Sequence, residues 1–416
     1  MIRIGKQRFK ILYGTSKGIL CLAVYRGIKI ENKTIKRFPN KSFVRKAIYI
    51  MLIILAILLV CVIILIGMLL AWSPGKPEPF LAENGNKLEG SISEKNHVKI
   101  NGMEQGMFIK SKNNNNPVLL LVHGGPGMPE YFLTEKYPTG LENYFTICYW
   151  EQRGAGLSYN ADTSPTFITV EQLISDTLAV TDYLRERFGQ EKVYLMGHSW
   201  GSYIGIKAVA QAPEKYNAYI GMSQISQQLE SEKLAYEYML EQYTAVGNTK
   251  MVQKLKSYSI YRSDAELHSY LFSLLRDEAM HDLGIGTMHN MKSVISGIFL
   301  PIMQCRAYTL GEKIDIWRGK VFSRNATNLV DKMYSEDLTT EVSQLDMPVY
   351  FFSGIHDYTV SYTLAADYLK KLQAPKKGFY TFEQSAHSPL FEEPEKFLRI
   401  MLEDVLNGAA NLSDTK

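Results

Sequence analysis

The stretch KVYLMGHSWGSYIGIKAVAQA (residues 192–212) decides the expected fold, because it changes from a strand pattern to a helix pattern across one serine. VYLM is apolar without alternation, as in a strand buried on both faces. The motif Gly197-x-Ser199-x-Gly201 lies at the junction. In a strand-turn-helix context a sharp turn exposes the serine hydroxyl, and glycines flank it because side chains there would collide. The stretch therefore predicts a nucleophile at Ser199, with an ordinary helix N-cap serine as the alternative.

The sequence around this stretch alternates between short apolar runs and helix-length segments. Before it lie VLLLV (118–122), FTICYW (145–150) and the helix-length ITVEQLISDTLAVTDYLRERF (168–188), which should end at Phe188-Gly189. After it come MPVYFFSG (347–354), SYTLAADYLKKL (361–372) and GFYTFEQ (378–384). This alternation predicts an α/β fold with a mainly parallel sheet flanked by helices.

Residues 224–345 interrupt the alternation with long helical patterns rich in Tyr and Met. A helical insertion in an α/β sheet most simply forms a lid over the carboxyl ends of the strands, where such folds bind ligands. We therefore expect a main domain made of residues 91–223 and 346–416, with a helical lid at residues 224–345.

The N-terminal part of the chain divides by charge into regions of different character. Residues 1–46 contain thirteen Lys or Arg and one acidic residue, residues 47–72 carry no charge, and the remainder has a net charge of −8. As a helix of about 39 Å, residues 47–72 exceed the roughly 30 Å core of a bilayer. Signal peptides have apolar regions of only about 7 to 15 residues. We therefore expect one transmembrane helix at residues 47–72, in contact with membrane lipid.

Basic residues are more numerous before this span than just after it, so the positive-inside rule predicts a cytoplasmic N-terminus. The main domain would then lie outside the cytoplasm, at the cell membrane. Residues 1–46 are interpreted as a basic cytoplasmic segment that sets this topology and rests on anionic lipid headgroups, with a dedicated binding module as the alternative. Residues 73–90, rich in Pro, Gly and polar residues, predict a linker.

The overall composition excludes several classes of protein. The 416 residues are 46% hydrophobic with a net charge of +4, so a large core is expected and a strongly basic nucleic-acid binder is not. The four cysteines are spread over the basic segment, the span and the main domain, so no disulfide framework is expected.

A serine nucleophile needs a histidine base, which in turn needs a carboxylate to orient it. In this fold the order along the chain is serine, acid, histidine. Asp357 directly follows the run YFFSG and so lies where a strand ends. Of the eight histidines, His387 lies after this acid and just beyond a strand-like run, while His356 adjoins the acid and is interpreted as facing away. The order therefore selects Asp357 and His387.

Acyl transfer also needs N–H donors aimed at the developing oxyanion. One candidate is the backbone of Trp200, which follows the nucleophile. The other is Gly125, in the loop His123-Gly124-Gly125-Pro126-Gly127, where glycines let the backbone approach a substrate closely. His123 is interpreted as a hydrogen-bonding brace of the loop rather than a catalytic group.

Three ordered motifs carry a family resemblance: HGGPG (123–127), WEQRGAGLS (150–158) and GHSWG (197–201). Together they resemble the prolyl aminopeptidase (proline iminopeptidase) branch of the α/β-hydrolase superfamily, over about residues 91–408. The resemblance implies Ser199, Asp357 and His387 as catalytic residues, Gly125 as an oxyanion donor, no metal or cofactor, and release of an N-terminal residue from peptides.

This sequence departs from the family pattern at two positions in these motifs. Glu151 stands where the family usually has Asp, and His198 where its prolyl-specific members usually have Gly. We expect Glu151 and Arg153 to support the loop through an ion pair.

Recognition of a free amino terminus calls for partly buried carboxylates at the rim of the site. Relatives use glutamates in the lid, and four candidates here have helical spacing: Glu230, Glu232, Glu237 and Glu241. A solvated helix face has the same pattern.

We therefore expect a membrane-anchored serine hydrolase, an aminopeptidase that releases an N-terminal residue, proline or another small or apolar residue, from peptides through an acyl-enzyme. The alternatives are a carboxylesterase or lipase-type enzyme acting on esters near the membrane, and a non-catalytic fold that binds a ligand. The substrate-binding residues are not identified by the sequence.

Overall fold

The computed structural model describes residues 2–4, 7–9, 41–258, 260–261 and 264–414. Most of the basic segment 1–46 therefore lies outside the described residues. The chain divides into two compact units, Met1–Ile66 and Gly67–Lys416. In the first unit, β1 (Ile2–Ile4) pairs antiparallel with β2 (Gln7–Phe9). Helix α1 (Lys41–Ala71) contains the stretch Arg45–Ala71, which is long and apolar enough to cross a membrane by length and composition.

The second unit is built on one eight-stranded sheet in the order β10-β9-β8-β7-β5-β6-β4-β3. Its strands are β3 (Ile92–Ile100), β4 (Met103–Ser111), β5 (Val118–Val122), β6 (Thr146–Trp150), β7 (Val193–His198), β8 (Tyr216–Met222), β9 (Val349–Gly354) and β10 (Lys377–Phe382). The hairpin β3–β4 pairs antiparallel, as does β4 with β6, and all other neighbours are parallel. The prediction of a mainly parallel sheet is confirmed.

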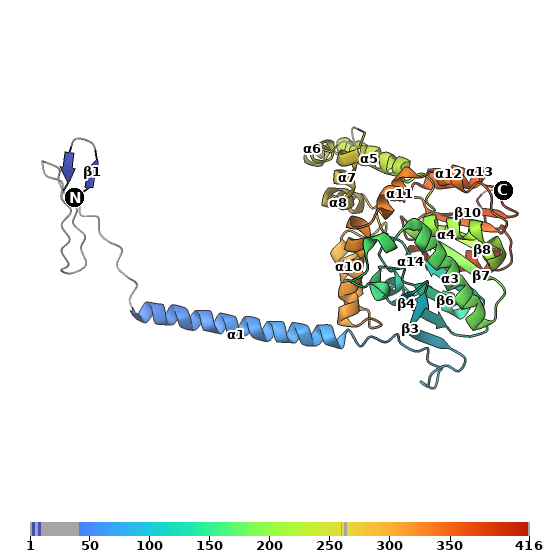
Figure 1. Ribbon diagram of the computed structural model, residues 1–416, viewed down its shortest axis with the longest axis horizontal. Helices are drawn as coiled ribbons and strands as arrows, with labels where there is room; N and C mark the ends of the chain where they lie inside the picture. The colour runs from blue at the N-terminus through green and yellow to red at the C-terminus, as the bar shows by residue number, and fades with distance from the viewer. Residues whose placement is uncertain (1, 5–6, 10–40, 259, 262–263, 415–416) are drawn as a thin grey trace. The chain divides into compact units, whose positions relative to one another are not determined.

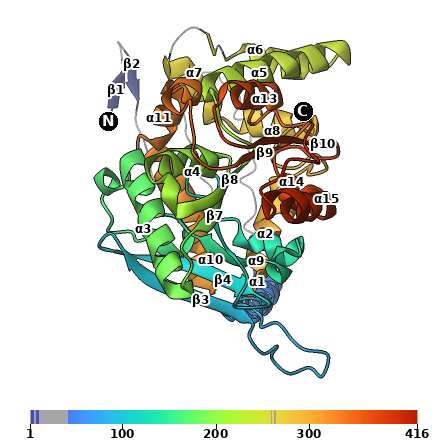
Figure 2. The same cartoon turned by 90° about the vertical axis from the view of Figure 1, so that its right-hand side faces the viewer.

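Helices cover both faces of this sheet because its central strands are apolar on both sides. In β5, Val118, Leu120 and Val122 belong to one buried cluster and Leu119 and Leu121 to the other. Figure 2 shows α3 (Val170–Phe188) and α4 (Trp200–Gln211) on one side, and α2 (Tyr131–Lys136), α14 (Pro389–Glu392) and α15 (Pro394–Ile400) on the other. Because strands β5 to β10 run parallel, their carboxyl ends lie at one edge of the sheet.

Helix α3 begins and ends where the sequence predicts. The Thr169 side chain accepts a hydrogen bond from the backbone N–H of Gln172, and Gly189 ends the helix with φ of 62°. That left-handed conformation suits glycine, which has no Cβ. Strand β8 is not among the strands predicted from the sequence; its seven residues are mostly buried between β7 and β9.

Between β8 and β9 the described residues form helices and no strand. We call residues 224–345 the helical insertion; its helices are α5 (Gln228–Ala245), α6 (Thr249–Lys256), α7 (Asp264–Leu271), α8 (Leu274–Asp282), α9 (Leu300–Gln304), α10 (Leu310–Asn325), α11 (Leu329–Ser335) and α12 (Leu338–Glu341). A π-helical turn at Ile295–Phe299 precedes α9. Figure 1 shows α5 to α8 grouped at one end of the insertion, where a third buried cluster joins them. Helix α13 (Tyr362–Lys371) follows β9.

The predicted linker contacts the helical insertion. Gly75 N donates to Arg306 O at 3.1 Å, and Lys313 Nζ donates to Trp72 O at 2.8 Å and to Met303 O at 2.7 Å. Pro74 forms an isolated bridge with Thr309. Residues 72–75 therefore pack against α10 and the segment just before it rather than lying free of the insertion.

Candidate active site

Ser199 occupies a sharp turn between β7 and α4, with φ of 54° and ψ of −121°. Few non-glycine residues adopt a positive φ, and here it orients the serine at the carboxyl end of the central strand. The flanking glycines are required by the packing. A Cβ on Gly197 would lie 2.4 Å from Gly201 O, and one on Gly201 would lie 1.8 Å from Val122 O.

His387 and Asp357 lie at the ends of neighbouring strands and contact each other. Asp357 follows β9 and His387 follows β10, and His387 Nδ1 is 2.9 Å from Asp357 Oδ2. The other carboxylate oxygen accepts the backbone N–H of Val360 at 2.9 Å. Both side chains are buried, so the carboxylate holds the imidazole with Nδ1 as donor, which leaves Nε2 as the free nitrogen.

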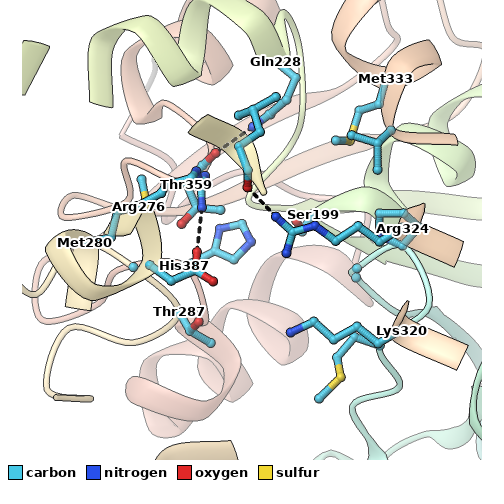
Figure 3. A pocket seen from close by; sticks show the side chains of 18 of the residues that line it. Ser199, Gln228, Arg276, Met280, Thr287, Lys320, Arg324, Met333, Thr359 and His387 are labelled. Atoms are coloured by element: carbon cyan, nitrogen blue, oxygen red, sulfur yellow. Dashed lines mark hydrogen bonds and ion pairs between the residues drawn. The ribbon is translucent and has the colours of Figure 1, made fainter. Parts of the chain in front are cut away.

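One cavity of about 260 Å³ brings the predicted site residues together. Gly125, Ser199 and His387 line it, and Figure 3 shows the Ser199 and His387 side chains in it. Asp357 lies behind His387, while Trp200 is fully buried as the first residue of α4. At that position the Trp200 N–H has no acceptor within the helix, which makes it available to a ligand.

The loop at residues 123–127 is held by hydrogen bonds from a neighbouring loop. Gln152 N donates to His123 Nε2 at 3.0 Å, so Nε2 is an acceptor and Nδ1 donates to Gly124 O at 2.8 Å. Burial lowers the pKa of His123, which agrees with this neutral form. Gln152 also accepts from Trp200 Nε1 at 3.0 Å. His123 therefore braces the loop, as expected.

A buried ion pair that sequence reasoning missed connects three parts of the site. His198 Nδ1 is 2.7 Å from Glu130 Oε1, and His198 Nε2 is 2.7 Å from His387 O. The same Glu130 oxygen accepts the N–H of Gly124 at 2.9 Å. Because a carboxylate and a carbonyl both accept, both nitrogens of His198 donate, as in the charged imidazolium.

The electrostatics of this pair agree with that assignment. Burial opposes the charge on His198, but the Glu130 carboxylate outweighs it and raises the pKa of His198. Burial likewise opposes the charge on Glu130, yet His198 holds the pKa of Glu130 below its usual value. No sequence periodicity links positions 130 and 198, so the pair could not be predicted from a pattern. The one feature of the sequence that points to it is His198, which stands where prolyl-specific relatives usually have Gly.

The expected ion pair between Glu151 and Arg153 is wrong. Arg153 instead forms a bidentate pair with Asp176 on α3, with Nε 2.7 Å from Oδ2 and Nη2 2.9 Å from Oδ1. Glu151 accepts hydrogen bonds from the Tyr308 hydroxyl and, at 2.5 Å, from Leu157 N. Burial raises the pKa of Glu151 to about 8, despite both donors. Glu151 is therefore a buried acid with a raised pKa that connects the loop to the helical insertion.

None of the four glutamates proposed for amine recognition lines the cavity. Glu230, Glu237 and Glu241 lie on the exposed or half-exposed side of α5. Glu232 is fully buried, but its oxygens are 2.7 Å and 2.8 Å from Arg276, which lies between it and the cavity. The carboxylates that do line the cavity are Glu130 and Asp277.

The described residues contain no group of three or more His, Cys, Asp or Glu side chains placed to hold a metal ion.

Comparison with known proteins identifies the family. The family model for the alpha/beta hydrolase fold matches residues 117–278. The chain is 31% identical over 307 residues to the "Probable aminopeptidase YbaC" of Bacillus subtilis, an alignment that covers 74% of this chain and 94% of that protein. It is 25% identical over 291 residues to the proline iminopeptidase of Clostridioides difficile, covering 68% of this chain and 88% of that protein.

Solved structures share the fold at low sequence identity. The crystal structure of proline iminopeptidase from Mycobacterium smegmatis superposes with a TM-score of 0.57 at 15% identity, covering 76% of this chain and 98% of that one. The fold of the second unit is therefore shared across sequences that have diverged widely.

Proposed function

Because the chain belongs to the α/β-hydrolase family, we propose that it is a serine hydrolase that releases an N-terminal residue, proline or another small or apolar residue, from peptides. One observation carries the proposal. Ser199, on the turn after β7, shares a cavity with His387, whose Nδ1 is 2.9 Å from Asp357 Oδ2. The homology to proteins named as a probable aminopeptidase and as proline iminopeptidases supports the choice of substrate class.

In the proposed cycle, His387 Nε2 takes the proton of the Ser199 hydroxyl as its oxygen attacks the substrate carbonyl. Asp357 holds Nδ1–H and stabilises the imidazolium that forms. The N–H groups of Gly125 and Trp200 donate to the oxyanion, and loss of one such donor costs about 3 to 4 kcal/mol of transition-state stabilisation. His387 then protonates the leaving amine and activates the water that releases the acyl group.

The amino terminus of a peptide substrate requires a carboxylate, and Glu130 and Asp277 are the two at the cavity. Each already contacts a basic group: Glu130 pairs with His198, and Asp277 Oδ1 is 3.1 Å from Arg276 Nη1. One oxygen of Glu130, Oε2, has no hydrogen-bond partner among the described residues. An ester hydrolase would not require a free carboxylate. Because Asp277 and one oxygen of Glu130 already contact basic groups, an ester hydrolase is the second candidate.

We further propose that α1 anchors the protein in the cell membrane as a single span. Its stretch Arg45–Ala71 supports this by length and hydropathy, and its apolar side chains are exposed. The excess of basic residues before the span favours a cytoplasmic N-terminus and a catalytic domain outside the cytoplasm.

A substrate panel tests the function directly. The full chain, purified in detergent micelles from the membrane fraction, would be assayed with N-terminal aminoacyl amides, their N-blocked forms and simple esters, with Ser199→Ala as the inactive control. We expect hydrolysis of free-amine amides that is lost on blocking, and a fall of at least about 10³-fold in kcat for Ser199→Ala. Turnover of esters alone would replace the peptidase by the esterase, and no turnover by the folded protein would favour a ligand-binding fold. The anchor predicts that the chain stays with membranes after an alkaline wash.

A further inference from the structure

The wall of the cavity formed by the helical insertion is rich in positive charge. Lys320 and Arg324 lie one helical turn apart on α10, and Arg276 lies on α8. All three line the cavity that contains Ser199. Figure 3 shows the Lys320 and Arg324 side chains extending from α10 into the cavity on the side of Ser199, with Arg276 across from them.

Arg276 is neutralised by carboxylates. Its Nε and Nη2 bond to the two oxygens of Glu232, and its Nη1 is 3.1 Å from Asp277 Oδ1. A buried cation with two acidic partners keeps those contacts, because removing either partner leaves an uncompensated charge. Arg276 therefore stabilises the helical insertion through these ion pairs and is not available to bind a ligand anion.

Lys320 and Arg324 have no carboxylate partner among the described residues. Lys320 Nζ lies 5.7 Å from the centroid of the Trp317 ring, and it has neither an ion pair nor a hydrogen bond within the described part of the chain. Arg324 donates to the backbone carbonyl of Leu271 and lies 4.4 Å from the centroid of the Phe272 ring. Burial lowers the pKa of Lys320, and Arg324 adds to this effect while Asp277 opposes it.

The acidic groups nearby do not cancel this charge. Glu130 is engaged with His198, and Asp277 with Arg276. Arg276, its two carboxylate partners Glu232 and Asp277, and the two cations Lys320 and Arg324 therefore carry a net charge of +1. Lys320 and Arg324 are thus two cations without acidic partners in the wall of one cavity. Such a pair can bind an anion, because charge-assisted hydrogen bonds are stronger where water is partly excluded.

Helix α10 holds these cations at a fixed place relative to the reacting serine. A Cβ on Gly319 would lie 2.6 Å from Gly154 O, and one on Gly127 would lie 2.7 Å from Ser323 Cβ, so the helix touches the loop that carries Gly125. Such close contact leaves little freedom for α10 to move away from the site.

We propose that Lys320 and Arg324 form a subsite that binds a carboxylate of the substrate. This deepens the proposed function and rests on it for the peptide nature of the ligand. The carboxylate has two possible sources: the carboxyl terminus of a very short peptide, or an acidic side chain next to the scissile bond. In the first case the enzyme acts on short peptides whose carboxyl terminus reaches α10 while the scissile bond lies at Ser199, since both line the same cavity of about 260 Å³.

Binding measured without turnover tests this subsite. The full chain carrying Ser199→Ala, in detergent micelles, would be titrated by calorimetry with two matched pairs. Alanyl-alanine against its C-terminal amide probes the carboxyl terminus, and glutamyl-alanine amide against glutaminyl-alanine amide probes the acidic side chain. We expect the charged member of one pair to bind at least about tenfold more tightly than the neutral member.

Variants of α10 assign the preference to the subsite. Adding Lys320→Met should reduce the charged-to-neutral ratio at least about fivefold while leaving the affinity for the neutral ligand within about twofold, and Lys320→Arg should retain the preference. Arg318→Gln is the matched control, because Arg318 lies on the same helix with 62% of its side chain exposed and pairs with Asp315. The thermal midpoint of each variant shows whether it is folded.

Three results would overturn the inference: charged and neutral members binding equally in both pairs, an unchanged preference in Lys320→Met, or no binding of any ligand up to about 10 mM, which is above usual KM values. The turnover assays give a separate answer on the proposed function. Selective binding of the charged ligand without hydrolysis would reject the peptidase function and support the subsite. Hydrolysis of free-amine amides without any preference for the charged ligand would support the peptidase function and reject the subsite.

Discussion

Replacing Glu130 with glutamine should destabilise the protein strongly, although Glu130 is not a catalytic residue. Its Oε1 is 2.7 Å from His198 Nδ1 and 2.9 Å from Gly124 N, and both of its ion-pair atoms are buried. Removing one partner of a buried pair costs about 3 to 5 kcal/mol. Glutamine keeps a side-chain oxygen that can accept the hydrogen bond from Gly124 N. We therefore expect the loss in free energy of unfolding to lie at the low end of this range, at about 3 kcal/mol. At about 2.1 cal/mol/K of unfolding entropy per residue, that lowers the thermal midpoint of a domain of this size by about 4 °C.

The destabilisation should depend on pH in a defined direction. The pKa of His198 is raised in the folded state. Its contribution to the free energy of unfolding is therefore fully present below its unfolded pKa of about 6.5, and it is lost as pH rises through the folded pKa. The pKa of Glu130 is lowered, so its contribution is present above its unfolded pKa of about 4.5 and is lost as pH falls through the folded pKa. The cost of Glu130→Gln should therefore be larger at pH 5.5 than at pH 8.5.

Thermal unfolding followed by tryptophan fluorescence suits this measurement, because Trp150 and Trp200 are both buried in the main core. Glu186→Gln is the matched control, since that glutamate is exposed on α3. A midpoint for Glu130→Gln within about 1 °C of the control at pH 5.5 would refute the ion pair, since a loss of about 3 kcal/mol cannot then be present. A cost that grows with pH would refute the charge assignment of His198.

Two further predictions concern the helical insertion and its contacts. The pKa of Glu151 is raised to about 8, so the folded state keeps a proton that the unfolded state releases above about pH 4.5. The free energy of unfolding therefore falls as pH rises between these values, by up to about 1.4 kcal/mol per pH unit. Glu151→Gln should remove this loss, which would be measured as a smaller drop in thermal midpoint from pH 5 to 8 than in the wild type. A Cβ on Gly127 would lie 2.6 Å from Ser323 Oγ and 2.8 Å from Gly319 O, at φ of 78°, so Gly127→Ala should cost at least about 2 kcal/mol and lower kcat. Gly311→Ala is the control: its Cβ meets no atom within 4 Å on α10, so it should leave kcat unchanged and stabilise the protein by at most about 1 kcal/mol.

Local pattern and chain order were enough to choose the three proposed catalytic residues from the sequence. Ser199 follows an apolar strand and is flanked by glycines whose replacement would collide with backbone. Asp357 and His387 each follow a strand, and parallel strands bring their carboxyl ends to one edge. These three residues could be chosen without knowing any contact between distant segments. In the structure Ser199 and His387 line one cavity, and Asp357 contacts His387 from behind it.

Partners that depend on packing between distant segments could not be chosen in the same way. Glu151 and Arg153 are close in sequence and opposite in charge, which suggested a pair. Arg153 instead reaches Asp176 on α3, while buried Glu151 is satisfied by the hydroxyl of Tyr308 from the insertion. Hydrophobic periodicity indicates which face of a helix is buried, but not which polar group it meets there.

The helical insertion therefore influences both the geometry of the site and its choice of ligand. Helix α10 presses Gly319 against the backbone of Gly154 and Ser323 against Gly127, and the same helix carries Lys320 and Arg324 into the cavity. A change that displaces α10 would move the loop of Gly125 and the cationic wall together, so rate and substrate preference should change together. A change confined to the Lys320 side chain leaves these backbone contacts intact. The comparison of Gly127→Ala with Lys320→Met thus separates positioning of the site from recognition of the ligand, because the first should lower kcat for charged and neutral substrates alike and the second should affect mainly the charged ones.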